Sequence, residues 1–148
     1  MKLFKLSKIL GLTTAFAISS QAALLIQQNK ALAGIGTSIL NSGEYLFVNQ
    51  SLISPNGKYK AIQQSDGRLG LYNYNTPLWA SYTYNKVAYY TIMQTDCNLV
   101  TYTYNRIPLW ASRTNGLGSG CRLRVQDDGN LVIYTDNNVP VWQTGTYR

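Results

Sequence analysis

Histidine is absent from this sequence of 148 residues, and cysteine occurs only twice. Without histidine, a Ser-His-Asp catalytic triad cannot form. Zinc and haem sites lose their most common nitrogen ligand, and the two cysteines lack the C-x-x-C spacing that is typical of redox and metal motifs. We therefore expect no metal site, no cofactor and no redox role for the thiols.

Acidic residues are also scarce, with six Asp/Glu against thirteen Lys/Arg and a formal net charge of +7. The excess of basic residues is smaller in residues 34–148, because Lys2, Lys5, Lys8 and Lys30 precede this range. Nine basic and six acidic residues remain there, which gives a net charge of +3. So mild a balance does not indicate a nucleic-acid partner, and we expect the arginines Arg113, Arg122 and Arg124 to be solvated.

Long apolar runs are missing except near the N-terminus. Residues 9–18 are mostly apolar, they follow three lysines, and Ala31-Leu32-Ala33 offers an A-x-A cleavage site before Gly34. This layout predicts a secretory signal peptide over residues 1–33, with Ser20-Gln21-Ala22 as an alternative cut. An uncleaved membrane anchor is the competing interpretation, although polar residues interrupt residues 9–26. We expect a secreted protein, periplasmic or surface-bound if the host is bacterial, with no membrane insertion after cleavage.

The two cysteines, Cys97 and Cys121, are an even pair in a chain that we expect to be exported. Such a pair favours a disulfide over two free buried thiols. A closed loop of about 25 residues would stabilise the fold by roughly 3–4 kcal/mol.

A nine-residue pattern occurs three times in the chain. It reads QSDGRLGLY at residues 64–72, QTDCNLVTY at 94–102 and QDDGNLVIY at 126–134. A Pro-apolar-Trp unit follows each copy, and the spacings are 31 and 32 residues for the tryptophans and 30 and 32 for the motif aspartates. Because two independent markers keep one period, residues 34–148 read as one domain with three internal repeats, at about 45–80, 81–111 and 112–148.

Within each repeat the composition favours short β-strands separated by turns. We predict first strands at 58–64, 88–94 and 122–126, second strands at 69–74, 99–104 and 131–135, and short third strands at the tryptophans. Asp-Gly between apolar runs is a hairpin signal. One repeat cannot bury a core alone, so we expect three antiparallel sheets around a common axis, as in a prism, with the tryptophans at its centre. A threefold barrel is the alternative. Residues 34–50 and 143–148 should complete one sheet from both ends.

The motif residues gather on one face of each hairpin. In the second copy Asn98, Val100 and Tyr102 alternate along a strand, Gln94 ends the preceding strand and Asp96 projects from the turn. A sugar hydroxyl both donates and accepts, so this set of carboxylate, amides, phenol and apolar group suits a sugar. Turn chemistry would explain Asp and Asn but not Gln and Tyr. The third copy has the same set: Gln126, Asp128, Asn130, Val132 and Tyr134.

These residues resemble the bulb-type, monocot mannose-binding lectins, whose motif is Q-x-D-x-N-x-V-x-Y and whose fold is the β-prism II. The second and third copies match the motif at every defined position, and the segment around Cys97 and residues 116–121 is also similar. The resemblance implies that Asp and Asn bind the mannose 2-hydroxyl, Gln the 3-hydroxyl and Tyr the 4-hydroxyl, with Val against the ring. It also implies a homodimer made by exchange of C-terminal strands, here residues 141–146.

The first copy departs from the motif, because Arg68 replaces Asn and Gly70 replaces Val, while Gln64, Asp66 and Tyr72 remain. Arginine has no acceptor and glycine removes the apolar contact. We predict a weak or inactive mannose site there.

An enzyme is the first rival interpretation, but a glycosidase needs two carboxylates about 5–10 Å apart. The repeat places its aspartates on different sheets, and the remaining acids, Glu44, Asp127 and Asp136, form no evident pair. We therefore predict a non-catalytic lectin for mannose-containing glycans. A lectin-like bacteriocin or toxin is the second rival, and a protein-binding prism whose sugar motifs are idle is the third.

Overall fold

Three antiparallel sheets of four strands make up residues 36–148, the part of the chain that the computed structural model describes. We name them after the repeats. Sheet I has the order β3-β4-β5-β6, sheet II β2-β7-β8-β9 and sheet III β1-β10-β11-β12. The strands are β1 (Ile39–Leu40), β2 (Tyr45–Phe47), β3 (Ser51–Ile53), β4 (Tyr59–Gln63), β5 (Leu69–Asn73), β6 (Thr76–Ala80), β7 (Tyr90–Met93), β8 (Leu99–Tyr102), β9 (Pro108–Ala111), β10 (Arg122–Val125), β11 (Leu131–Tyr134) and β12 (Pro140–Gln143).

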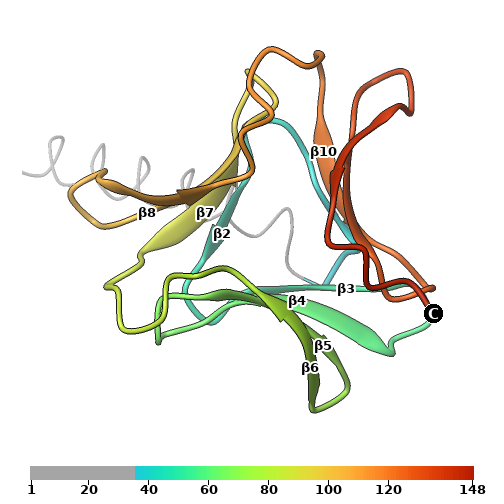
Figure 1. Cartoon of the computed structure of the whole chain (residues 1–148), viewed down its shortest axis with the longest axis horizontal. Helices are drawn as coiled ribbons and strands as arrows, with labels where there is room; N and C mark the ends of the chain where they lie inside the picture. The colour runs from blue at the N-terminus through green and yellow to red at the C-terminus, as the bar shows by residue number, and fades with distance from the viewer. Residues whose placement is uncertain (1–35) are drawn as a thin grey trace, which may run out of the picture.

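The three sheets lie as the three sides of a triangle, with sheet I along the bottom of the view, sheet II at upper left and sheet III at right (Figure 1). They remain separate sheets and do not close into a barrel. The predicted all-β fold, a β-prism II of three antiparallel sheets, is therefore confirmed. All six predicted repeat strands are present, each one to three residues shorter than predicted, and the third strands lie at the tryptophans.

The N-terminal segment differs from the prediction. We expected residues 34–50 to complete a single sheet, but β1, β2 and β3 each join a different one. The physical reason is the core: each of these short strands inserts one fully buried leucine, Leu40, Leu46 or Leu52, so each sheet receives one. The C-terminal expectation is correct only in part, because β12 pairs with β11 in sheet III but ends at Gln143. Exchange of this tail with a second copy stays a prediction.

Alternation along the strands separates core from surface. In the second strand of each repeat the residues that point inward are fully buried: Leu69, Leu71, Leu99, Thr101, Leu131 and Ile133. The residues between them face outward, and they are the motif positions. Sheet register is the same in all three repeats, including a shift between the second and third strands just before the motif tyrosine. The three outer faces therefore carry their motif residues at equivalent positions.

The tryptophans were predicted at the centre of the prism, but they are only partly buried and pack against one another beside it. Trp79, Trp110 and Trp142 meet edge to face, with ring centroids 5.5–5.8 Å apart. Together they flank the buried cluster of leucines, which fills the centre of the prism in their place. One tryptophan from each repeat thus ties the three sheets together.

The predicted disulfide is confirmed between Cys97 and Cys121, whose Cα atoms lie 5.1 Å apart. It joins the turn between β7 and β8 to the start of β10, and so links sheet II to sheet III. Residues 36–148 contain no helix that is long and apolar enough to cross a membrane. The predicted signal peptide, residues 1–33, lies outside the described residues.

Candidate functional site

Each outer face carries one copy of the nine-residue motif, and we number the sites after the sheets. Site 1 lies on β4 and β5, site 2 on β7 and β8, and site 3 on β10 and β11. In each site the glutamine follows the first strand, the aspartate stands in the turn, and the last positions lie on the second strand. The structure thus places all the residues predicted for a site on one hairpin, namely Gln64, Asp66, Arg68 and Tyr72 in site 1; Gln94, Asp96, Asn98, Val100 and Tyr102 in site 2; and Gln126, Asp128, Asn130, Val132 and Tyr134 in site 3.

The turn backbone is the same in the three sites. In site 2, Gln94 donates its backbone N–H to Asn98 and Cys97 donates to Gln94, at 2.9 and 3.1 Å. The residue after the aspartate has a positive φ in every copy, 97° at Gly67, 73° at Cys97 and 85° at Gly129. Glycine adopts this conformation without strain. Cys97 adopts it as well, and there its side chain forms the disulfide.

The aspartate uses one oxygen for the turn. Its Oδ1 accepts the backbone N–H two residues later, at 2.9 Å from Asn98 in site 2 and 2.9 Å from Asn130 in site 3. The second oxygen of Asp96 and of Asp128 receives no hydrogen bond from the described residues. Both sites therefore present a carboxylate oxygen, fixed in direction, that can accept from a ligand hydroxyl.

The asparagine is held by hydroxyl groups from the segment after the third strand. The side-chain oxygen of Asn98 accepts from Ser112 Oγ at 3.1 Å and from the Thr114 backbone at 3.2 Å. That of Asn130 accepts from Thr144 Oγ1 and from the Gly145 backbone, both at 3.0 Å. Because the side-chain oxygens are bound, the NH₂ group is the part of each amide that remains for other partners. In site 3 one of these N–H groups donates to Gln143 at 2.8 Å.

These hydroxyl groups were not predicted as site residues. In every repeat a serine or threonine two residues after the tryptophan bonds a threonine two residues further on, at 2.7–2.8 Å. That threonine donates to the backbone carbonyl of the left-handed turn residue, at 2.6–2.7 Å. The signal in the sequence was the pattern W-x-[ST]-x-T, which follows all three motifs at residues 79–83, 110–114 and 142–146. These serine and threonine side chains hold the turn in place and so position the residues of the site.

The glutamine and the tyrosine bond each other across the hairpin. Gln94 Nε2 donates to Tyr102 Oη at 3.0 Å, and Gln126 Nε2 donates to Tyr134 Oη at 2.8 Å. Each tyrosine hydroxyl keeps its own hydrogen for a ligand. The valines are nearly covered, with 3% of Val100 and 2% of Val132 exposed, so each can offer a ligand only a small apolar contact.

Site 1 has the same backbone but a different distribution of charge. Arg68 donates to Asp66 Oδ2 from Nε at 3.0 Å and from Nη2 at 2.6 Å, while Asp66 Oδ1 caps the turn. The hydrogen bonds from the Arg68 guanidinium lower the pKa of the Asp66 carboxyl, against the opposing effect of burial. Both carboxylate oxygens are occupied, so site 1 has no free acceptor on its aspartate.

The loss of valine also changes site 1. A Cβ on Gly70 would lie 2.7 Å from Tyr72 Cε2 and 2.8 Å from Gln64 Oε1, so these side chains close over the glycine. Here Tyr72 donates to Gln64 at 3.1 Å, and its hydroxyl hydrogen is used. A hollow of about 220 Å³ lies beside them, lined by Lys60, Ile62, Gln64, Tyr72, Tyr74 and Asn75.

Metal-binding groups are not found in residues 36–148: no three of the His, Cys, Asp and Glu side chains there come together in a way that could hold an ion. The side chains at sites 2 and 3 offer a ligand hydrogen bonds from a carboxylate, two amides and a phenol.

Proteins with similar sequences include lectins. No family model matches the chain. A B-type lectin, plumieribetin of Scorpaena plumieri, is 40% identical over 85 residues, which are 57% of this chain and 74% of that protein. A mannose-specific lectin of Narcissus pseudonarcissus is 48% identical over 42 residues, 28% of this chain and 38% of that protein.

Solved structures give the same result over a longer span. Monomeric monocot mannose-binding lectins from Gastrodia elata align with a TM-score of 0.69 at 36% identity, covering 76% of this chain and all of theirs. The mannose-specific agglutinin of snowdrop (Galanthus nivalis), solved with methyl-α-D-mannoside, aligns with a TM-score of 0.62 at 37% identity, covering 75% of this chain and 98% of its own.

Proposed function

The chain belongs to the family of bulb-type (B-type, monocot mannose-binding) lectins, and from this premise we propose that it is an exported, non-catalytic lectin that binds D-mannose or mannose-rich glycans at sites 2 and 3. The observation that carries the proposal is the free second oxygen of Asp96 and of Asp128, beside an asparagine amide whose oxygen is already bound.

These two groups define a donor and an acceptor of fixed direction. A mannose 2-hydroxyl that lies between them donates to the carboxylate and accepts from the amide N–H. Gln94 or Gln126 then serves the 3-hydroxyl, and Tyr102 or Tyr134 serves the 4-hydroxyl. An epimer with an equatorial 2-hydroxyl directs that group elsewhere, and this difference would make the site selective.

We expect these sites to be shallow and the binding at each one to be weak. Two equivalent sites on different faces of one molecule can compensate, since a surface that displays many glycans engages both and the second contact is intramolecular. Site 1 adds nothing to mannose binding, because Arg68 occupies the carboxylate that the sugar needs.

Affinity chromatography tests this function. Residues 34–148 are applied to immobilised mannose and eluted with free mannose or galactose. We expect retention that mannose releases and galactose does not. Absence of retention on both mannose and mannan columns would contradict the proposal and favour a prism with idle sugar motifs, or a toxin. Hydrolysis of a mannoside by the pure protein would contradict the absence of catalysis.

A further inference from the structure

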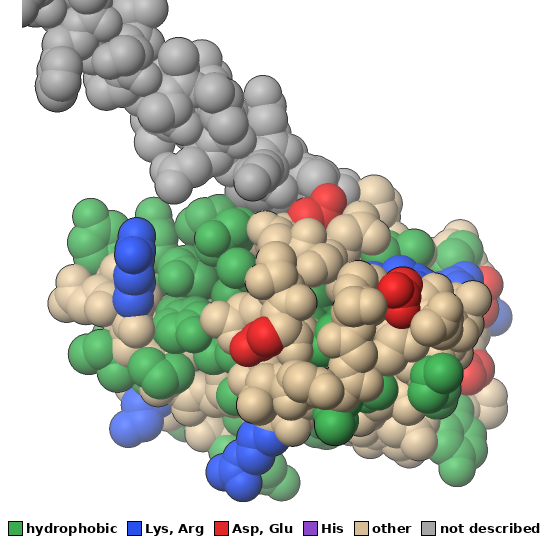
Figure 2. Space-filling view, turned by 90° about the horizontal axis from the view of Figure 1, so that it is seen from above, with side chains coloured by type: hydrophobic (Ala, Val, Ile, Leu, Met, Phe, Trp, Pro, Cys, Tyr) green, Lys and Arg blue, Asp and Glu red, His purple; other side chains and the backbone are tan. Residues whose placement is uncertain are grey.

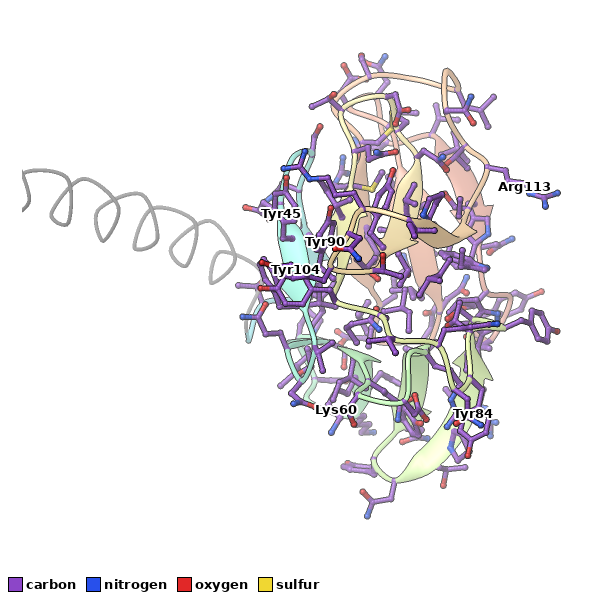
Figure 3. The ribbon with its side chains drawn as sticks, turned by 90° about the vertical axis from the view of Figure 1, so that its left-hand side faces the viewer. Tyr45, Lys60, Tyr84, Tyr90, Tyr104 and Arg113 are labelled. Carbon is purple, nitrogen blue, oxygen red and sulfur yellow. A yellow bond between two sulfur atoms is a disulfide. The ribbon has the colours of Figure 1, made fainter. Side chains whose placement is uncertain are left out.

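Six aromatic side chains form a continuous surface on the outer face of sheet II. Their ring centroids lie 5.2–5.9 Å apart in seven contacting pairs. We call this surface the aromatic platform: Tyr45, Phe47, Tyr89, Tyr90, Tyr102 and Tyr104. Figure 3 shows Tyr45, Tyr90 and Tyr104 together on one side of the molecule. In Figure 2 hydrophobic side chains gather at the left, the end where sheet II lies in Figure 1.

The fold does not require aromatic residues at these positions. The register pairs Phe47 with Tyr90 and Tyr90 with the motif residue Tyr102. The equivalent places in sheet I hold Ile53 and Lys60. In sheet III, Arg122 stands beside the motif tyrosine. Since three sheets of one design share a core and only one carries the platform, the platform serves something other than packing.

Much of the platform is open to water. Tyr104 is 74% exposed and Tyr89 42% exposed, while Tyr45, Phe47 and Tyr90 are half-buried. Exposed apolar groups that gather in one place mark a binding surface more often than isolated ones do. Five of the six residues are tyrosines, so the surface combines ring faces with hydroxyl groups at their edges.

Site 2 and the platform share a residue. Tyr102 receives the hydrogen bond of Gln94 at 3.0 Å, and its ring centroid lies 5.5 Å from that of Tyr90. Tyr45 and Phe47 continue the surface from Tyr90 onto β2. A ligand that begins in site 2 and passes Tyr102 thus meets the platform directly. Burial also raises the pKa of the Tyr90 hydroxyl, which therefore remains a donor into the alkaline range.

We propose that the platform binds the second and following pyranose rings of a neutral oligosaccharide whose terminal mannose occupies site 2. A pyranose has an apolar C–H face and a rim of hydroxyl groups, which match the ring faces and hydroxyls of the tyrosines. A second copy of the chain is a less suitable occupant, because a partner seated on Tyr90 and Tyr102 would cover site 2. The proposal rests on the proposed function and deepens it. Site 2 would bind an oligosaccharide, whereas site 3 would bind a single mannose residue.

Two background variants isolate the sites. Asp128→Asn leaves site 2 as the intact site, and Asp96→Asn leaves site 3; both keep an oxygen for the turn. Each is titrated by calorimetry with methyl α-D-mannoside and with an α-linked mannotriose. We expect the mannotriose to bind site 2 about tenfold more tightly than the monosaccharide, and site 3 about equally.

The platform is then altered in the background that retains site 2. Tyr45→Ser and Phe47→Ile introduce the residues of the equivalent strand β3, Ser51 and Ile53, and so preserve the fold. We expect the monosaccharide affinity to remain and the gain for mannotriose to disappear. Tyr104→Ser, at a position where the side chain is mostly exposed, is a second variant that cannot disturb the core.

The outcomes separate the two proposals. If methyl α-D-mannoside binds neither site, the proposed function is wrong. If it binds both but the mannotriose gains equally at sites 2 and 3, or the gain survives the platform variants, the inference is wrong and the function stands. If sedimentation shows a dimer that these substitutions dissociate while the mannotriose gain is unchanged, the platform is a dimer interface, and the inference is again wrong.

Discussion

Site 1 and site 2 share a backbone but differ in what the aspartate can do. In both, the carboxylate caps the turn with one oxygen, at 3.1 Å in site 1 and 2.9 Å in site 2. In site 2 the second oxygen is free, whereas in site 1 Arg68 holds it with two hydrogen bonds. The turn therefore needs the aspartate regardless of any ligand, and its presence alone does not indicate a working site. The residue two positions later decides whether the carboxylate is available.

The comparison also shows where the repeats are free to differ. Inward-facing residues of all three sheets pack one core and stay apolar or small, with the exception of a hydrogen-bonded group formed by Gln63, Thr91 and Thr101. Outward-facing neighbours of the motif tyrosine differ completely: Lys60 in sheet I, Tyr90 in sheet II and Arg122 in sheet III. One fold can thus carry three surfaces of different chemistry.

The largest effect comes from the disulfide, which ties down the turn of site 2 and has no equivalent in the turn of site 1. Replacing both cysteines, as in Cys97→Ala with Cys121→Ser, should lower the free energy of unfolding by about 3–4 kcal/mol. Cys97→Gly with Cys121→Ser should lose about 1 kcal/mol less, because glycine adopts the positive φ of this position without strain. Urea unfolding measures both. Equal stability of the two variants would contradict the role of the left-handed turn.

The second largest effect comes from removing the free carboxylate oxygen that distinguishes sites 2 and 3 from site 1. Asp96→Asn and Asp128→Asn keep the turn hydrogen bond but remove the charged acceptor. Each should weaken mannose binding at its site by about 10- to 100-fold, since a hydrogen bond to a charged group contributes about 1.5–3 kcal/mol. Calorimetric titration with methyl α-D-mannoside measures the loss. Asp66→Asn is the matched control and should leave mannose binding unchanged; a loss there would show that site 1 binds mannose.

Most of the fold and of the placement of the site residues could be predicted from the sequence. The repeat indicates both where the strands alternate and where the turns lie. Residues that are local in sequence, such as Gln94 and Tyr102 on one hairpin, were placed together correctly. The pairing of β2 with β7 was missed, because a three-residue strand gives too little periodicity to choose among three sheets. The ion pair of Arg68 with Asp66 was missed as well: arginine was expected to remove a contact, but it also occupies the carboxylate.

Two substitutions should restore mannose binding at site 1. Arg68→Asn with Gly70→Val should give site 1 the motif of the other sites and raise the number of mannose molecules bound per chain from two to three. The new amide oxygen can accept from Ser81, as Asn98 accepts from Ser112, and the valine must push Gln64 and Tyr72 aside. Calorimetric stoichiometry measures the gain. Arg68→Asn alone should rebuild the site only in part. A double variant that folds and still binds two would show that the loss of site 1 has another cause.

The smallest effect is the contribution of the Arg68–Asp66 ion pair to stability. This contribution depends on pH, and the ion pair is specific to site 1 among the three sites. Hydrogen bonds from Arg68 lower the pKa of Asp66 in the folded protein below that in the unfolded chain. The pair therefore stabilises the fold above the unfolded pKa, and this stability is lost as pH falls through the lowered folded pKa. Both side chains are partly exposed, so the contribution should stay below about 1 kcal/mol.

Urea unfolding of the unmodified protein and of Asp66→Asn, at several pH values from neutral to strongly acidic, measures this contribution. The asparagine cannot titrate, but its oxygen can still accept the Arg68 N–H, so the turn is kept. The unmodified protein should be slightly more stable at neutral pH, with the difference vanishing in acid and shrinking in high salt. A difference that does not change with pH would mean that Asp66 contributes through the turn alone. Arg68 would then act in site 1 only by occupying the oxygen that sites 2 and 3 leave free.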